Sequence, residues 1–439
     1  MGENRVKGQQ YTPLGRLKAS VIFGYCCMMI ALMTPATLLL TFKILEITPD
    51  ASASNAAFGV VTGVGAFFAL IGNPVGGALS DRTNIRLGRQ RTWIIIGPVV
   101  ACSALVLIGF ATEVWQVVIL WSIVQLFFNF GMAAYTALVP DQVPVEKQGS
   151  VSGLIGIAIP VAIALGMVLM NLMPDASTPA KWITLAIIGI AGPIISTFFI
   201  KDGKVEIERE ASSIPLGEKL RNIYPNPRKH PAFTWAMAGK FLLMMGYCSS
   251  VYLTMMLVQR MGLSETAATG VVTTINIASM AAAAVMSVLG GTLSDKFGKQ
   301  KPFLYVSGAI MAIGVFIFAF FPSIPVFIAA SAIIGLGYGC FSAVDTALVA
   351  RILPNKENAA KDLGFMNVAN ALPQSIVPAI APFLLAVGGW EGFYIVLGLC
   401  AVLGVIVVKP LPERSRKDTS LGSKESNVDD HIGPTHTVS

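Results

Sequence analysis

The chain has 439 residues, of which 54% are hydrophobic and only 13% carry a charge. About a quarter of the residues in a soluble domain are charged, so this composition excludes an ordinary soluble protein. The apolar residues form runs long enough to cross about 30 Å of hydrocarbon as helices, which predicts an all-α membrane protein. A transmembrane β-barrel would instead show short alternating segments, and these are absent from the sequence.

Twelve apolar runs have the length of a membrane-spanning helix, at about 1.5 Å per residue. The predicted spans are residues 19–43, 55–79, 92–111, 115–140, 150–173, 181–200, 231–258, 265–292, 302–321, 324–350, 360–387 and 389–409. The first run is too long for a cleaved signal segment, so we interpret it as a span.

Lys and Arg gather in the short segments between the spans. If the N-terminus is cytoplasmic, all but four of the 31 lie on the cytoplasmic side. The four are Lys43, Lys181, Lys240 and Arg260. This asymmetry predicts that both termini are cytoplasmic, in a plasma (cytoplasmic, or inner) membrane. It also accounts for the net charge of +7 without a nucleic-acid partner.

The longest polar interruption divides the spans into two sets of six. We expect a cytoplasmic N-tail at 1–18, a six-helix bundle at 19–200, a cytoplasmic linker at 201–230, a second six-helix bundle at 231–410 and a disordered cytoplasmic tail at 411–439.

Two sequence patterns occur once in each half. Gly77-Ala-Leu-Ser-Asp-Arg ends the second span, and Gly291-Thr-Leu-Ser-Asp-Lys ends the eighth, at an offset of 214 residues. Thr-Ala-Leu-Val in the fourth span recurs in the tenth at an offset of 210. The same order at nearly equal offsets indicates a tandem duplication. Glycines of the second and tenth spans, such as Gly77 and Gly339, are expected to allow close helix packing.

Twelve spans in a 6+6 plan, with Gly-x-Leu-Ser-Asp-Arg between the second and third, resemble the major facilitator superfamily. The resemblance covers about residues 19–410 and implies two pseudo-symmetric bundles around a central cavity. Two details are similar to the glycoside–pentoside–hexuronide:cation symporters and the sucrose transporters. They are the long loop motif that ends in Gly88-Arg-Gln-Arg-Thr-Trp and the segment Tyr135-Thr-Ala-Leu-Val-Pro-Asp.

The sequence departs from two related groups. Symporters of the glycoside group often carry acidic residues for sodium in the second span, and this span has none. The fourth span has Trp121-Ser-Ile-Val-Gln where proton-coupled drug antiporters typically have an arginine. The first departure weakens sodium coupling, and the second weakens drug efflux.

Only Lys240 in the seventh span and Asp345 in the tenth are charges placed well inside the predicted spans. Charges within a bilayer are costly, so both are candidates for function. Both lie about 10–14 Å from the cytoplasmic ends of their spans, and the resemblance places these spans beside the central cavity. Protonation of Asp345 would release Lys240 and couple a proton to a conformational change. The alternatives are a static ion pair or no contact at all.

Amide and tyrosine side chains lie at helical spacing in several spans. Amides exchange hydrogen bonds with hydroxyl groups and aromatic rings stack on sugars, so these residues are candidates for substrate binding. The alternative for each amide is a hydrogen bond between helices. The candidates are Tyr25, Gln125, Asn129, Tyr247, Tyr338, Asn367, Asn370 and Gln374.

The two loop motifs place acidic residues among cations at the cytoplasmic ends of the second and eighth spans. Such clusters can hold the cytoplasmic side shut in one state and release it in another. The alternative is that the cations only set the orientation. The candidate gate residues are Asp81, Arg82, Arg89, Arg91, Asp295 and Lys296.

No sequence pattern indicates an enzyme. There is no Walker loop and no nucleophile–base constellation, and the six cysteines lie in apolar runs without metal-ligand spacing. We therefore expect no catalytic residue, no metal and no cofactor.

The sequence predicts a monomeric secondary transporter whose partners are a small-molecule substrate, protons and the lipid bilayer. The expected substrate is a sugar or glycoside, moved by proton symport with alternating access. Two alternatives stay open: a proton-coupled exporter of drugs or metabolites, and a non-transporting sensor built on a transporter fold.

Overall fold

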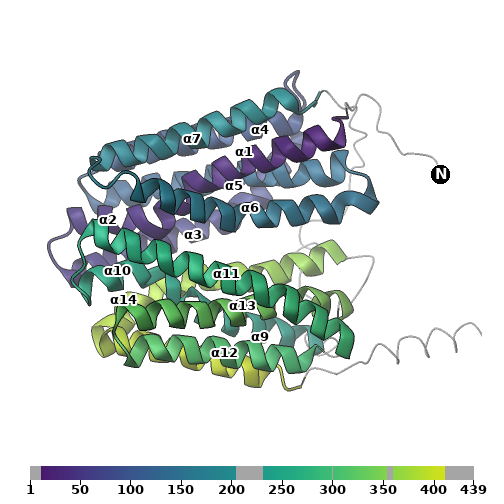
Figure 1. Ribbon diagram of the computed structural model, residues 1–439. Helices are drawn as coiled ribbons and strands as arrows, with labels where there is room; N and C mark the ends of the chain where they lie inside the picture. The colour runs from purple at the N-terminus through teal and green to yellow at the C-terminus, as the bar shows by residue number, and fades with distance from the viewer. Residues whose placement is uncertain (1–10, 204–230, 299, 353–358, 411–439) are drawn as a thin grey trace, which may run out of the picture.

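The computed structural model describes residues 11–203, 231–298, 300–352 and 359–410. Within these ranges every regular element is a helix. Figure 1 shows two groups of helices, one above the other. The predicted disordered tail at 411–439, residues 1–10 of the N-tail and residues 204–230 of the linker lie outside the described residues.

The first group contains α1 (Leu14–Thr34), the π-helical segment η1 (Pro35–Leu39), α2 (Leu40–Ile47), α3 (Ala51–Arg82), α4 (Arg89–Gly109), α5 (Val114–Gln142), α6 (Val145–Asn171) and α7 (Thr178–Phe199). The second group contains α9 (Pro231–Tyr247), the 3₁₀ segment η2 (Cys248–Tyr252), α10 (Leu253–Gln259), α11 (Glu265–Phe297), α12 (Lys301–Phe320), α13 (Ile324–Ile352) and α14 (Ala359–Val407).

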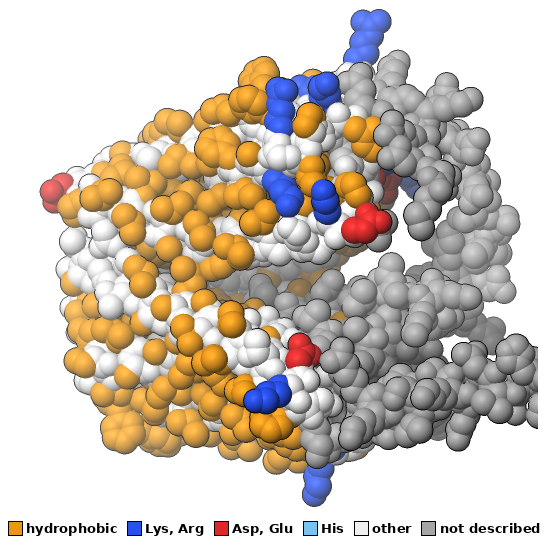
Figure 2. All heavy atoms as spheres, turned by 45° about the vertical axis from the view of Figure 1, so that its right-hand side comes forward, with side chains coloured by type: hydrophobic (Ala, Val, Ile, Leu, Met, Phe, Trp, Pro, Cys, Tyr) orange, Lys and Arg blue, Asp and Glu red, His pale blue; other side chains and the backbone are white. Residues whose placement is uncertain are grey.

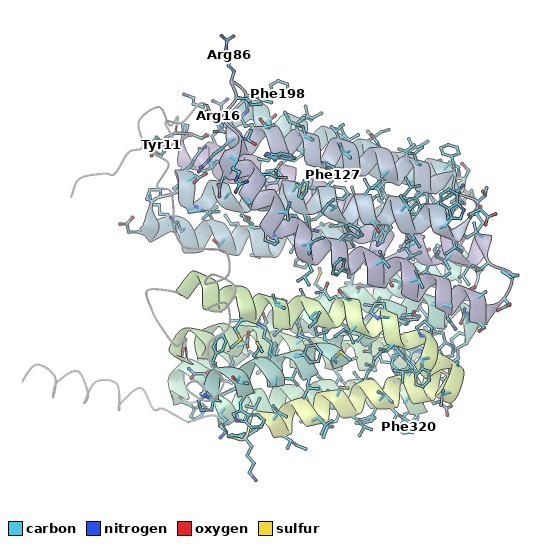
Figure 3. All side chains as sticks on the ribbon, turned by 180° about the vertical axis from the view of Figure 1, so that it is seen from behind. Tyr11, Arg16, Arg86, Phe127, Phe198 and Phe320 are labelled. Atoms are coloured by element: carbon cyan, nitrogen blue, oxygen red, sulfur yellow. The ribbon has the colours of Figure 1, made fainter. Side chains whose placement is uncertain are left out.

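Eleven helical segments of the described chain are long and apolar enough to cross a membrane. One of them, within α14, is two helices joined at Gly389, whose φ of 59° lies outside the helical region. A left-handed φ suits glycine because it has no Cβ. Figure 3 shows the yellow half of α14 running back in the direction opposite to the first half. Eleven segments with one divided in two give twelve spans, so the predicted fold class is confirmed.

Large apolar side chains cover the outside of both groups. Phe198 and Phe320 are 72% and 58% exposed, and Figure 3 shows both pointing away from the helices. An apolar exterior of this extent is what a bilayer requires and what water would oppose. The first helix begins at Leu14, within the predicted N-tail.

An even number of spans brings both ends of the described chain to one end of the molecule. We call this the inner end, at the right of Figure 1, and the opposite end, with α2 and α10, the outer end. The cytoplasmic location of the inner end stays a prediction from the placement of Lys and Arg.

The two groups share an apolar core at the outer end. One cluster joins the buried residues of the first group to Tyr252, Phe327 and Phe393 of the second. The inner part of the second group has its own cluster, around Phe233 and Leu304. Figure 2 shows a hollow between the groups at the inner end.

Polar contacts also join the groups at the outer end. The Tyr252 hydroxyl donates to the carbonyl oxygen of Asn55 at 3.2 Å, and the Thr254 hydroxyl donates to that of Thr37 at 2.7 Å. Thr37 lies in η1, and Thr254 lies in α10, just after η2. The structure is therefore closed at the outer end and open at the inner end.

Glycines bring α11 and α13 together inside the second group. A Cβ at Gly339 would overlap the backbone carbonyl group of Ala283, which cannot move without moving α11. The sequence expectation for Gly77 is wrong, because a Cβ there would meet nothing within 4 Å.

We expect Gly339→Ala to lower the free energy of unfolding by about 1–3 kcal/mol, because it overpacks a rigid contact. Gly77→Ala is the matched control and should leave stability equal or slightly higher, since alanine favours helix. Thermal unfolding of both purified variants measures this difference. Equal transition temperatures for the two variants would contradict the assigned packing.

Candidate functional site

The two charges inside the spans are in contact. Lys240 Nζ donates to Asp345 Oδ2 at 2.7 Å, between α9 and α13. Their side chains are 11% and 13% exposed, so the pair is mostly but not completely removed from solvent. Each charge satisfies the other, which makes both tolerable inside the bilayer.

Two stacked tyrosines lie two helical turns away from this ion pair. The rings of Tyr247 and Tyr338 have centroids 4.1 Å apart and planes 17° apart. Tyr247 packs against both the shared outer core and the separate inner cluster. The four residues Lys240, Tyr247, Tyr338 and Asp345, which we call the α9–α13 cluster, therefore lie where the closed outer part meets the open inner part.

The predicted amides of α14 lie close to the boundary between the groups. Gln374 is exposed and Asn370 is half-buried. Their neighbour Ser375 borders Gly63 of α3, in the other group. The side chain of Asn367 lies outside what the structure describes. Both described amides are thus placed on a helix of the second group that packs against α3 of the first.

Two other candidates lie within the packing of the first group. Tyr25 is buried and meets the ring of Tyr135 edge-on at 5.8 Å, and the Tyr135 hydroxyl shares a hydrogen bond with Ser196. Asn129 is buried and donates from Nδ2 to the backbone oxygen of Gln125 in its own helix, at 2.7 Å. The Gln125 side chain is half-buried. The structure does not bring these residues to the α9–α13 cluster.

The predicted gate residues of the first loop motif form a network within the first group. Arg89 Nη2 binds Asp141 Oδ1 at 2.6 Å, and Arg89 Nη1 lies 3.7 Å from Asp81 Oδ1. Gln90 Nε2 donates to Asp141 at 3.0 Å, and the Ser80 hydroxyl donates to Gln90 at 2.6 Å. These residues belong to α3, α4 and α5, so the network holds the inner ends of one group together.

Asp202 completes this network, although its position in the charged linker gives no signal of it. Its Oδ2 accepts the backbone N–H groups of Gln90 and Arg91 at 2.8 and 3.1 Å, at the N-terminus of α4. A carboxylate is favoured there by the helix dipole. Gly88, at φ 98°, passes so close that a Cβ would overlap Asp202.

The acidic residue and the cation of the second loop motif differ from those of the first. Asp295 and Lys296 are exposed, and no ion pair joins either to a described residue. Arg82 of the first motif is also exposed.

The sequence profile described as Major Facilitator Superfamily matches residues 21–282 and 266–433. The chain belongs to the major facilitator superfamily. A solved structure of the nucleoside transporter NupG has a TM-score of 0.71 and 12% identity to it, covering 90% of this chain and 99% of that one. A D-xylose–proton symporter has a TM-score of 0.67 and 16% identity, covering 91% and 97%. At such identities these likenesses show the fold alone.

Among curated proteins, the multidrug resistance protein MdtG of Proteus mirabilis (strain HI4320) is 28% identical over 163 residues. The match spans 37% of this chain and 39% of that protein. Family and fold are thus those of membrane transporters of small molecules, whereas the cargo and the coupling ion have to be argued from the site.

The network around Arg89 predicts that its two carboxylates contribute differently to stability. Asp141 is 18% exposed and binds Arg89 tightly, whereas Asp81 is 67% exposed at a longer distance. Asp141→Asn should cost about 1.5–3 kcal/mol of stability, and Asp81→Asn less than about 1 kcal/mol. Thermal unfolding of the purified variants measures the difference. The reverse order would show that Asp81, not Asp141, anchors the network.

Proposed function

We propose that this transporter moves a small polar solute, a sugar or glycoside, in symport with a proton by alternating access. The observation that supports it most is the Lys240–Asp345 ion pair, placed at the border between the closed and open parts of the molecule. The proposal also takes the predicted bundles at 19–200 and 231–410 as the units that rock, in a plasma membrane and as a monomer.

Protonation gives the ion pair a way to change. A neutral Asp345 loses its attraction for Lys240, and each residue then prefers another partner. Because the pair joins α9 to α13, its release loosens the inner part of the second group, where the separate apolar cluster lies. A proton taken up at Asp345 would thereby alter the same helices that border the hollow.

The α9–α13 cluster also has the chemistry of a sugar site. The paired tyrosine rings present an aromatic surface with hydroxyl groups, two helical turns from a cation and an anion. The amides of Asn370 and Gln374 supply donors and acceptors from the first helix of α14. Met366 of that helix belongs to the apolar cluster against which Tyr247 and Tyr338 pack. The fold shared with a D-xylose–proton symporter agrees with this interpretation.

We expect Asp345→Asn to abolish uptake driven by an inward proton gradient while solute exchange at equal concentrations persists, because asparagine cannot carry the proton. Uptake of labelled sugars into proteoliposomes measures both. Glu391→Gln, which alters another ion pair of the second group, is the control and should retain driven uptake. Driven uptake by the Asp345 variant would remove this residue as the proton carrier.

We expect Gln374→Ala to weaken sugar binding about five- to tenfold, the effect of losing one hydrogen bond of about 1 kcal/mol or slightly more. Gln148→Ala is the matched control, because this amide binds the Val143 carbonyl at the inner end of the first group. Isothermal titration of the purified proteins measures both constants. An unchanged affinity in the first variant would assign Gln374 to packing.

Export of a drug or metabolite in exchange for protons is the second candidate, supported by the partial match to MdtG. Membrane vesicles of known orientation distinguish the candidates. A symporter accumulates solute when the proton gradient points inward, and an exporter extrudes it under that gradient. A sensor on the same fold would bind the solute without accumulating it.

A further inference from the structure

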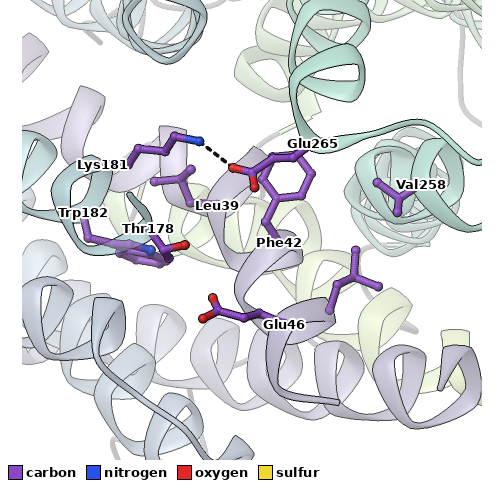
Figure 4. A pocket seen from close by; sticks show the side chains of 9 residues that line it. Leu39, Phe42, Glu46, Thr178, Lys181, Trp182, Val258 and Glu265 are labelled. Atoms are coloured by element: carbon purple, nitrogen blue, oxygen red, sulfur yellow. Dashed lines mark hydrogen bonds and ion pairs between the residues drawn. The ribbon is translucent and has the colours of Figure 1, made fainter. Parts of the chain in front are cut away.

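A cavity lies between the two groups at the outer end, apart from the α9–α13 cluster. Its volume is about 280 Å³, and Figure 4 shows the side chains that line it. Leu39 of η1 and Trp182 of α7 come from the first group, whereas Val258 of α10 and Glu265 of α11 come from the second. This volume is near the lower limit of ligand sites, so it suits a small organic molecule.

The wall of the cavity is mainly apolar and contains two aromatic rings, those of Phe42 and Trp182. The indole N–H group of Trp182 is buried and has no hydrogen-bond partner among the described residues. Thr178 lies one helical turn before Trp182 on α7 and adds a hydroxyl group to the wall. A buried donor without an acceptor is costly, so a ligand oxygen that accepts from Trp182 would be stabilised there.

Two ion pairs border the cavity, each with its acidic end more exposed than its basic end. Lys181 Nζ lies 2.7 Å from Glu265 Oε1, and Lys43 Nζ lies 3.3 Å from Glu46 Oε2. The two lysine side chains are 9% and 3% exposed, whereas the two glutamates are 43% and 51% exposed. An ammonium group that lies deeper than its carboxylate partner leaves the negative end of the pair facing outwards. Both glutamates line the cavity, so its wall attracts a cation.

Carboxylates beside aromatic rings are surroundings that favour an organic ammonium ion, through charge attraction and cation–π contact. We propose that this cavity binds a small organic cation that carries an oxygen atom, as a ligand separate from the transported solute. The carboxylates of Glu46 and Glu265 attract its charge, the rings of Phe42 and Trp182 contact its alkyl groups, and the Trp182 N–H group donates to its oxygen.

The cavity is complete only while the outer end is closed, because both groups contribute to its wall. A ligand that binds one conformation shifts the population of molecules towards it. The bound cation therefore holds the outer end closed and inhibits transport without occupying the α9–α13 cluster. Inhibition depends on the proposed alternating access, whereas binding depends on neither the cargo nor the coupling ion.

Choline is a suitable probe, because it combines a quaternary ammonium group with one hydroxyl group. Its uncharged isostere dimethylbutanol has the same shape, with carbon in place of nitrogen. We expect isothermal titration of the purified full chain, at constant ionic strength, to show choline bound about tenfold more tightly than dimethylbutanol. Equal affinities, or no binding of choline, would overturn the proposal.

Two variants of the wall locate the bound choline. We expect Glu46→Gln to weaken its binding about fivefold, through loss of a charge contact. Phe42→Leu should weaken it about threefold, because leucine keeps the apolar contact without the ring. Phe42→Leu also leaves both ion pairs in place, so it decides the location of the site if Glu46→Gln unfolds.

Glu391→Gln is the matched control. This acid is 65% exposed at the same end of the molecule, and its pair with Arg260 is not part of the cavity wall. Its replacement should leave the affinity for choline unchanged. Full affinity in Phe42→Leu would overturn the assigned site, and so would an equal loss in Glu391→Gln.

Hydrogen–deuterium exchange tests whether choline holds the outer end closed. Residues 35–47 and 248–259 are joined across the groups by the hydrogen bond from Thr254 to Thr37. We expect choline at ten times its dissociation constant to slow exchange in peptides covering both ranges about tenfold. Exchange that stays the same or becomes faster would overturn the conformational role of the ligand.

Asp345→Asn separates this site from the proposed transport site. The affinity for choline should be unchanged in this variant, because Asp345 does not line the cavity. Loss of choline binding would place the cation in the α9–α13 cluster and overturn the proposal. These measurements use no sugar and no proton gradient, so failure of sugar transport or of proton coupling would leave their outcome unaffected.

Discussion

A charge inside hydrocarbon has to be matched by an opposite charge or by water, and this constraint explains where the polar residues of the chain lie. Lys240 and Asp345 satisfy each other within the second group, whereas Lys181 and Glu265 do so between the groups. On the proposed cycle, rocking of the groups would leave the first pair intact and separate the second. Release of the first pair needs a chemical event such as protonation, which suits it to proton coupling. The second pair responds to the movement of the groups themselves.

The conformation follows from where apolar and polar contacts are made. The shared core and the hydrogen bonds of Tyr252 and Thr254 hold the outer end closed. At the inner end the Arg89 network joins α3, α4 and α5 of the first group, and Asp81 is left mostly exposed. On the proposed cycle, Asp81 is available to the second group when the inner ends approach, while Lys181 and Glu265 separate at the other end.

Much of the fold can be predicted from the sequence, because a bilayer fixes the length and apolar character of each span. The similar depths of Lys240 and Asp345 in their spans favour a contact between the two charges, and this contact is present. The orientation of each helix cannot be predicted in the same way. Both lipid and protein interior are apolar, so the sequence pattern does not separate an exposed Phe198 from a buried Phe128.

The same limitation explains which contacts of the candidate residues cannot be predicted from the sequence. Residue type and, for Asn129, helical spacing make Tyr25 and Asn129 substrate candidates, whereas in the fold both have partners within the first group. In the sequence Asp202 is one charge of a polar linker, whereas in the fold it caps α4. Lys181 and Glu265 are separated by 84 residues at the ends of different spans, and only the folded arrangement brings them together.

The central claim is that solute and proton cross together through the α9–α13 cluster. It is tested most directly by adding a transported sugar to weakly buffered proteoliposomes and recording the external pH. The account predicts alkalinisation in fixed proportion to the sugar taken up, which vanishes when Asp345 is replaced by asparagine. Sugar uptake without any change of pH, or a pH change that persists in that variant, would contradict it.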